Sequence, residues 1–367
     1  MILDPPSSMI PAYEARVRWA RGRMESLGVD CALITNLPNV RYLSGFSGTT
    51  GSAVVFGDES VFLTDFRYTS QAAEEVKNHR IIEYKEFNES LIALLRSKGV
   101  GRMGFETERM THHKAGELES KLDFLKMLPL RGFIEERRLI KDAPEIEAMA
   151  LLNDLLTEVF PRAIALMKPG AVERDIAVEI EYMLRKNGAD GPAFDFIVAS
   201  GERSALPHGV ASEKTLKDGD MVTLDWGAKR RGYHSDNTRT MALGHASAEL
   251  EKIYSIVLEA NMAAIEFVRP GVTVKQVDDV ARGIITKAGY GDYFGHGTGH
   301  GVGLDIHEKP GVSWREETIV QPNMVFTIEP GIYLPGRGGV RIEDMVAVTG
   351  NGCRVLSEKI PKELMRI

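Results

Sequence analysis

Residues 222–243 read VTLDWGAKRRGYHSDNTRTMAL, and residues 325–348 read VFTIEPGIYLPGRGGVRIEDMVAV. Each stretch contains two apolar, strand-like runs joined by a short segment with Arg and Gly, a pattern typical of a β-hairpin. Each run also carries one acidic residue: Asp225, Asp236, Glu329 and Glu343. The sequence therefore predicts two acidic hairpins in the second half of the chain.

The spacing of the acids predicts how they face one another. The midpoint between Asp225 and Asp236 falls in the connection 229–232 of the first hairpin, and the midpoint between Glu329 and Glu343 falls in the turn of the second. Each pair is therefore expected to lie opposite on neighbouring strands. Facing carboxylates repel one another unless a cation lies between them. A single acid is most often solvent-exposed, but two opposed pairs favour a cluster of cations.

A third element is the glycine-rich stretch 296–308, HGTGHGVGLDIHE. Its glycines allow the backbone to approach another group closely, and the alternation after His300 predicts a strand or an extended loop. A phosphate-binding loop is the alternative, but the chain has no GxxxxGK[ST] motif and no GxGxxG that opens a helix after a strand. The four acids and His300 form an oxygen-rich donor set. Such a set favours a site for two divalent ions such as Mn²⁺, Co²⁺ or Fe²⁺ over a zinc site built from thiolates.

The first 140 residues alternate helical and strand-like patterns, which predicts a compact α/β unit. The expected elements are a helix, three strands and a further helix at residues 12–27, 31–36, 52–57, 60–65 and 90–97. The composition then becomes charged over residues 135–147, and Pro144 follows Lys141-Asp142 as at a helix start. We expect a linker there, and two domains that comprise residues 1–137 and 138–367.

The second half of the chain contains an internal repeat. Residues 168–189 resemble residues 269–290, because a Pro-Gly pair, a Lys and a later Gly recur with an offset of 101. Each copy predicts an amphipathic helix that follows Pro-Gly and ends at the later Gly. The alternative is that the repeat arises by chance, because Pro-Gly and Asn-Gly are common turn dipeptides. A duplication usually leaves a crevice between its halves, where chemistry is expected.

The composition excludes several classes of protein. The chain has 367 residues, with 45 Lys and Arg against 52 Asp and Glu, so its net charge is −7 and it is not a generally basic nucleic-acid binder. The start lacks the pattern of a secretory signal and no apolar run is long enough to span a membrane, so we expect a cytoplasmic protein. Two cysteines, Cys31 and Cys353, cannot form a disulfide framework, and both are expected to be small core residues.

Five motifs, VTLDWGA, SDNTRT, GHGTGHGVGLDIHE, TIEPG and VRIED, together resemble the pita-bread metallopeptidases, in particular the branch of Xaa-Pro dipeptidases and Xaa-Pro aminopeptidases. The stretches NVRYLSGFSGTTG and FLTDFRYTSQA are similar to the creatinase-type amino-terminal domain of that branch. The resemblance covers nearly the whole chain. It implies an α/β (α+β) fold, with a creatinase-like domain followed by a pseudo-symmetric pita-bread catalytic domain.

The resemblance also implies a metal site with two divalent ions, Mn²⁺ or Co²⁺ foremost, with Fe²⁺ or Zn²⁺ as further possibilities. Asp225 would bind one ion, Asp236 and Glu343 would bridge both, and His300 and Glu329 would complete the shell of the second ion. All five positions hold a ligand-type residue in this chain. Two ions at such a site would activate a water to attack a peptide carbonyl.

The family also uses residues beside the metals. Glu329 would shuttle a proton to the leaving nitrogen, and His208 and His307 match two histidines that orient the substrate and stabilise developing charge. A bond to proline is a tertiary amide without an N–H, which explains why it needs a dedicated enzyme. The expected substrates are small peptides with proline at the second position, and a homodimer is implied as well.

One position departs from the family pattern. Some dipeptidases have an Arg shortly after the His-Glu pair, suited to the carboxylate of the substrate, but here Gly311 stands in that place. Lys309, Arg315 or Arg337 could substitute for it. We favour a dipeptidase because the chain is short, and the alternative is an aminopeptidase acting on longer peptides. A metal-free creatinase-like hydrolase and a non-catalytic binding protein are disfavoured by the intact ligand set.

Overall fold

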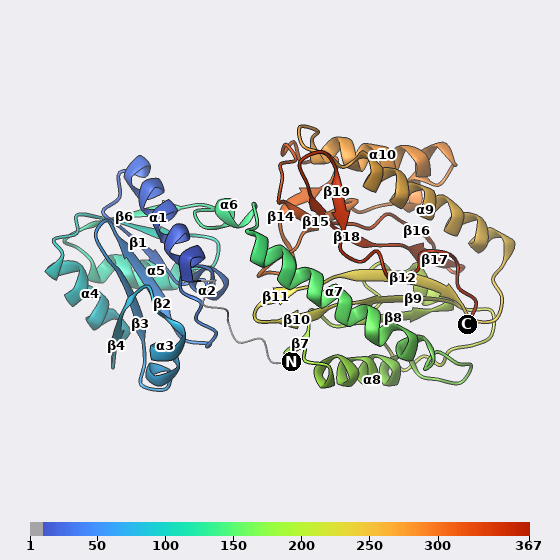
Figure 1. The fold of residues 1–367 in the computed structure, drawn as a ribbon, viewed down its shortest axis with the longest axis horizontal. Helices are drawn as coiled ribbons and strands as arrows, with labels where there is room; N and C mark the ends of the chain where they lie inside the picture. The colour runs from blue at the N-terminus through green and yellow to red at the C-terminus, as the bar shows by residue number, and fades with distance from the viewer. Residues whose placement is uncertain (1–9) are drawn as a thin grey trace. The chain divides into compact units, whose positions relative to one another are not determined.

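The computed structural model describes residues 10–367. The chain divides into two compact units, one that ends at Arg138 and one that begins at Leu139 (Figure 1). Among the described helices, none combines the length and the apolar character needed to cross a membrane.

The first unit is built on one six-stranded sheet with the strand order β4-β3-β2-β1-β5-β6. The central strand β1 pairs antiparallel with β2 and parallel with β5. The strands are β1 (Cys31–Ile34), β2 (Ser52–Phe56), β3 (Ser60–Thr64), β4 (Arg80–Glu83), β5 (Arg102–Glu106) and β6 (Lys126–Leu130). The helices are α1 (Ile10–Leu27), α2 (Leu37–Ser44), α3 (Thr69–Glu75), α4 (Phe87–Ser97), α5 (His112–Lys121) and α6 (Glu135–Arg138).

The inner strands β1 and β3 of the first unit's sheet are buried on both faces, as their sequence indicates. All four residues of β1 are buried, because the apolar run from Cys31 to Ile34 leaves no polar face for solvent. Leu91 and Leu95 of α4 pack against one face of this core. The expected helix at 12–27, the three strands and the helix at 90–97 are confirmed, and α4 begins three residues earlier than predicted.

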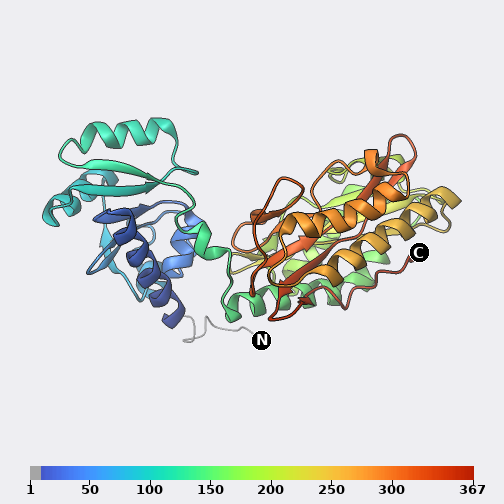
Figure 2. The ribbon, with the colours of Figure 1, turned by 90° about the horizontal axis from the view of Figure 1, so that it is seen from above.

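The second unit contains two pairs of long helices, and the strands lie between them (Figures 1 and 2). The helices are α7 (Ala143–Ile164), α8 (Glu173–Lys186), α9 (Ala248–Phe267) and α10 (Val274–Lys287), with two short 3₁₀ turns at Gly201–Ala205 and Gly291–Tyr293. The expected helix start is confirmed: Asp142 caps α7 in a capping box with Glu145, and a proline occupies its first turn.

The predicted repeat is confirmed. Helices α8 and α10 have equal lengths and are offset by 101 residues, as are the glycines Gly170 and Gly271 that precede them, each at φ 92°. Such a positive φ favours glycine, which has no Cβ to clash. The later glycines, Gly188 and Gly289, also have positive φ angles directly after the helices.

The strands of the second unit form four sheets, ordered β12-β9-β8, β11-β10-β7, β14-β13-β15-β18-β19 and β16-β17. In chain order they are β7 (Gly191–Pro192), β8 (Ile197–Ser200), β9 (Met221–Trp226), β10 (Ala228–Arg230), β11 (Tyr233–His234), β12 (Asn237–Ala242), β13 (Gly299–Gly301), β14 (Glu308–Val312), β15 (Val325–Ile328), β16 (Gly331–Leu334), β17 (Gly338–Arg341), β18 (Asp344–Val348) and β19 (Cys353–Val355).

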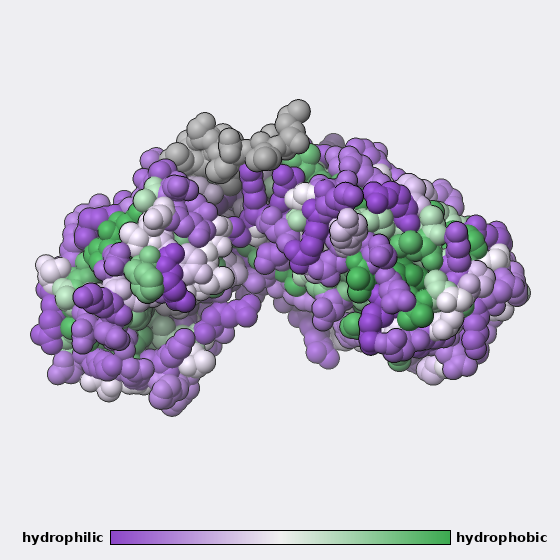
Figure 3. All heavy atoms as spheres, turned by 90° about the horizontal axis from the view of Figure 1, so that it is seen from below, coloured by the Kyte–Doolittle hydropathy of each residue, from purple (hydrophilic) through white to green (hydrophobic). Residues whose placement is uncertain are grey.

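The face drawn in Figure 3 is mainly hydrophilic, with hydrophobic residues in smaller areas between the hydrophilic ones. Both cysteines have free thiols. Cys31 is a core residue as expected, whereas Cys353 is only partly buried because β19 lies at the edge of its sheet.

Candidate metal centre

The second acidic hairpin has the predicted register. Gly331 pairs with Arg341 in β16–β17, and Ile328 pairs with Asp344 in β15–β18. Both pairs have the same centre, at Gly336, so Glu329 and Glu343 fall opposite one another between the two ladders. Glu343 is fully buried and Glu329 is largely buried.

The first acidic hairpin corrects a prediction. Asp225 pairs with Thr238 rather than with Asp236. The connection is the two-residue turn Arg231-Gly232, in which both residues have positive φ (51° and 81°), as a type I′ turn requires. The register is therefore displaced by two residues from the predicted one. Because side chains alternate along a strand, a two-residue shift keeps Asp225 and Asp236 on the same face of the hairpin.

His300 connects the two hairpins. It lies in β13, and its Nε2 is 3.5 Å from Asp236 Oδ2 and 3.4 Å from Glu329 Oε1. One ligand-type atom each from Asp236, His300 and Glu343 lie within 4.8 Å of one another. The structure thus brings together residues that are spread over more than 100 positions of the chain.

The electrostatics of this cluster are dominated by burial of the carboxylates and by their mutual repulsion. Burial, and then the charges of Glu343 and Asp225, raise the pKa of Asp236 well above its usual range. Burial raises the pKa of Glu343 and of Glu329 as well. Burial lowers the pKa of His300, so this imidazole is neutral at neutral pH and can act as a ligand.

Two buried oxygen atoms test whether a metal fits. Within residues 10–367, Asp225 Oδ1 and Glu343 Oε1 are buried and have no hydrogen-bond partner. Burying an unpartnered carboxylate oxygen is costly, and a coordinated cation removes that cost. Four carboxylates and one imidazole also suit borderline divalent ions. The residues present therefore fit a divalent metal site.

Arg341 is a further member of the site that the sequence analysis missed. Its Nη2 donates to Asp225 Oδ2 at 2.6 Å, its Nη1 donates to Tyr333 Oη at 3.0 Å, and its Nε donates to Thr238 Oγ1 at 3.2 Å. Thr238 Oγ1 in turn donates to Glu343 Oε2 at 2.7 Å. Arg341 precedes Glu343 by two residues in the VRIED motif, so strand alternation could have placed the two on one face.

His208 and His307 lie beside the carboxylate cluster, in loops and not in strands. The rings of His307 and His300 have centroids 4.3 Å apart in an edge-on arrangement. Burial, and then the charges of His300 and His208, lower the pKa of His307. The loop that carries His208 is tied to the centre through Pro207, whose carbonyl oxygen accepts from Arg341 Nη1 at 3.2 Å.

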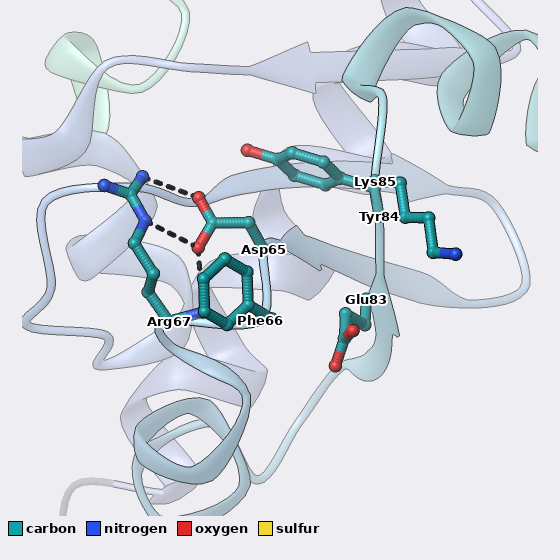
Figure 4. Close-up of a pocket in the computed structure, with 6 residues that line it drawn as sticks. All are labelled: Asp65, Phe66, Arg67, Glu83, Tyr84 and Lys85. Atoms are coloured by element: carbon teal, nitrogen blue, oxygen red, sulfur yellow. Dashed lines mark hydrogen bonds and ion pairs between the residues drawn. The ribbon is translucent and has the colours of Figure 1, made fainter.

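The first unit has a surface hollow of another kind, lined by six residues that Figure 4 shows: Asp65, Phe66, Arg67, Glu83, Tyr84 and Lys85. The Arg67 guanidinium donates to both carboxylate oxygens of Asp65 and lowers the pKa of that carboxyl. These two charges therefore satisfy each other. The hollow contains none of the predicted site residues.

Comparison with known proteins agrees with this geometry. Residues 147–350 match metallopeptidase family M24, and residues 16–140 match the creatinase/prolidase N-terminal domain. An uncharacterized peptidase of Bacillus subtilis (strain 168) is 44% identical over 94% of this chain and 98% of its own length.

Two solved structures extend the comparison. The chain is similar to an Xaa-Pro dipeptidase from Bacillus anthracis, with a TM-score of 0.94 and 40% identity over 97% of this chain and 100% of the other. It is also similar to an X-Pro aminopeptidase from Thermotoga maritima MSB8, with a TM-score of 0.88 and 37% identity over 94% and 100% of the two chains. The expected fold class is confirmed, and the chain is a peptidase that belongs to the pita-bread metallopeptidases of family M24, whose members use divalent metal ions.

Proposed function

We propose that this peptidase is an Xaa-Pro dipeptidase with a two-metal centre. The observation that supports this most is the convergence of two acidic hairpins on His300, with buried carboxylate oxygens that lack a hydrogen-bond partner. Similarity to an Xaa-Pro dipeptidase over nearly the whole chain supports the substrate class. We also propose the domain limits 1–137 and 138–367, a homodimer, and Mn²⁺ or Co²⁺ as the metal.

In this proposal the metal ligands are Asp225, Asp236, His300, Glu329 and Glu343. Asp225 would hold one ion, Asp236 and Glu343 would be shared by both ions, and His300 and Glu329 would complete the ligand set of the second ion. Arg341 and Thr238 orient the carboxylates from behind, because one donates to Asp225 and the other to Glu343. Divalent ions held by these residues would lower the pKa of a water and polarise the scissile carbonyl.

Three side chains are proposed to act on the substrate. Glu329 Oε1 accepts from Thr327 Oγ1 at 3.2 Å, so Glu329 Oε2 is the atom that carries a proton to the leaving nitrogen. The ring N–H groups of His307 and His208 donate to the carbonyl oxygen as negative charge develops on it. The lowered pKa of His307 keeps its ring neutral at the pH at which it must donate.

A dipeptide brings a carboxylate next to its proline, and this charge needs a cation. Gly311 pairs with His300 in β13–β14, so it lies beside the centre but supplies no charge. Arg337 is at the far turn of its hairpin and forms an ion pair with Glu249. Lys309 and Arg315 are both exposed, and Arg315 lies over the ring of its neighbour Trp314, which leaves Lys309 as our first choice.

The experiment that tests the function compares kcat/KM for Ala-Pro, Ala-Pro-Ala and Ala-Ala on Mn²⁺-loaded protein. A dipeptidase cleaves Ala-Pro fastest. A preference for Ala-Pro-Ala would instead support the aminopeptidase alternative, which the similarity to an X-Pro aminopeptidase also favours. Efficient cleavage of Ala-Ala would contradict proline specificity, and full activity after exhaustive chelation would contradict the metal centre.

A further inference from the structure

A buried lysine lies where the chain enters the second unit. Lys141 is only 2% exposed, and its Nζ is 2.9 Å from Glu308 Oε1. Lysine is rarely buried unless it is paired. A buried ion pair is also strongly destabilised when one partner is removed, because the other charge remains without compensation. The pair between Lys141 and Glu308 therefore joins two segments of the chain that are far apart in sequence.

Glu308 uses its second oxygen to close its own loop. Its Oε2 accepts from the backbone N–H of Asp305 at 3.4 Å. The carboxylate lies so close over Gly303 that a Cβ at this position would be 2.5 Å from Oε1, so any other residue there would force the carboxylate to shift. The loop from Gly303 to Glu308 is thus folded around a single carboxylate that Lys141 neutralises.

The same loop is held from a second side. The carbonyl oxygen of Gly303 accepts from the backbone N–H of His234 at 3.1 Å and from its Nδ1 at 2.9 Å. The neighbouring Tyr233 donates its hydroxyl to Glu145 Oε1 at 2.9 Å. Glu145 Oε2 accepts from the backbone N–H of Asp142 at the start of α7. The beginning of α7 therefore holds the loop directly through the ion pair and indirectly through β11.

This loop presents His307, which directly precedes Glu308 and contacts the ring of His300. We propose that Lys141 is a positioning residue for His307, because it holds and neutralises the carboxylate that fixes the loop. The inference rests on the proposed function in one point, the assignment of His307 to hydrolysis. Lys141 itself acts through Glu308.

The test uses the full-length, Mn²⁺-loaded protein and the variant Lys141→Met, which replaces the ammonium group by a methyl end and keeps an unbranched side chain one atom shorter. Four quantities are measured: kcat and KM for Ala-Pro, bound metal, melting temperature, and amide hydrogen exchange of residues 302–307. We expect exchange about tenfold faster in this loop and kcat about tenfold lower, with KM and bound metal unchanged. The control is Lys359→Met, which removes an exposed ion pair with Asp154 (side chains 65% and 43% exposed). This control should change neither the exchange of the loop nor kcat.

A second variant, Glu308→Gln, removes the same pair from the other side and keeps the proposal testable if Lys141→Met does not fold. It should also speed exchange in the loop and lower kcat. Because both substitutions remove one interaction, the double variant should lose no more kcat than the more affected single variant does. Additive losses in the double variant, or wild-type exchange and kcat in Glu308→Gln, would overturn the proposal. If the wild type does not cleave Ala-Pro, the proposed function fails. The exchange measurement would then still test whether the ion pair between Lys141 and Glu308 holds the loop.

Discussion

The substitution Asp236→Asn should stabilise the metal-free protein and at the same time abolish its stabilisation by metal. Asp236 is 4% exposed, and its carboxylate lies within 4.8 Å of a Glu343 oxygen. Burial and the charges of Glu343 and Asp225 raise its pKa in the folded state. The asparagine side chain has nearly the same shape as aspartate but carries no charge, so it removes the repulsion with the other carboxylates. It also removes a carboxylate that we propose as a bridging ligand.

The distance sets the size of the effect. Two unit charges 4.8 Å apart repel by about 3.5 kcal/mol at an effective dielectric constant of about 20. For a unit of this size, about 1 kcal/mol corresponds to about 2–4 °C in melting temperature, so the full repulsion corresponds to a gain of about 7–14 °C. An acid with a raised folded-state pKa favours folding at low pH and loses that contribution as the pH rises through the raised value. The gain should therefore be small at pH 5 and larger at pH 8.

Scanning calorimetry of chelated protein at pH 5 and pH 8, repeated with Mn²⁺, tests this reasoning. With Mn²⁺ the wild type should have a higher melting temperature than Asp236→Asn, because only the wild type binds the ions tightly and gains stability from them. Asp195→Asn, which changes an exposed aspartate of the same unit, is the matched control and should shift neither melting temperature. Equal melting temperatures for the metal-free variant and wild type at pH 8, or equal stabilisation of both by Mn²⁺, would refute the argument.

Three further predictions concern activity. His208→Ala and His307→Ala should retain bound metal but lose about 10²–10³ in kcat, the usual effect of removing one transition-state donor; metal loss in either variant would show that a ligand has been misassigned. Lys309→Met should raise KM for Ala-Pro more than for Ala-Pro-Ala, while Arg337→Met should leave both unchanged; if Arg315→Met gives the larger effect, that residue holds the carboxylate. Chelation should abolish activity and Mn²⁺ should restore it, as activity and metal assays on one sample will show.

The sequence predicted the topology of the hairpins better than their registers. The second register follows from a turn centred on Gly336, where the positive φ of 74° suits glycine. The first register was displaced because Arg231 also adopts a positive φ, which is uncommon for a residue other than glycine and cannot be recognised from its type. The displacement of two residues left the acidic face unchanged. A displacement of one residue would have moved Asp225 and Asp236 to opposite faces.

Buried cations were the part of the site that the sequence did not reveal. Lysine and arginine are nearly always exposed, so a prediction from residue type alone places Arg341 and Lys141 in solvent. Both are buried, and each pairs with a carboxylate of a distant segment, Asp225 and Glu308 respectively. Such pairs depend on tertiary contacts that no local pattern encodes. The acids were recognisable only because each of two hairpins carries one acid on each of its strands.

The charges at the centre argue for two divalent ions and not one. Four carboxylates contribute −4, and Arg341, which donates to Asp225, contributes +1, so the cluster carries −3 when its acids are ionised and its histidines neutral. One divalent ion leaves −1, and the excess negative charge would have to be relieved by protonation of a buried acid. Two divalent ions give +1, which attracts the carboxylate of a small peptide. The same count explains why burial and mutual repulsion raise the carboxyl pKa values without metal, and why protons and metal ions should compete for this site.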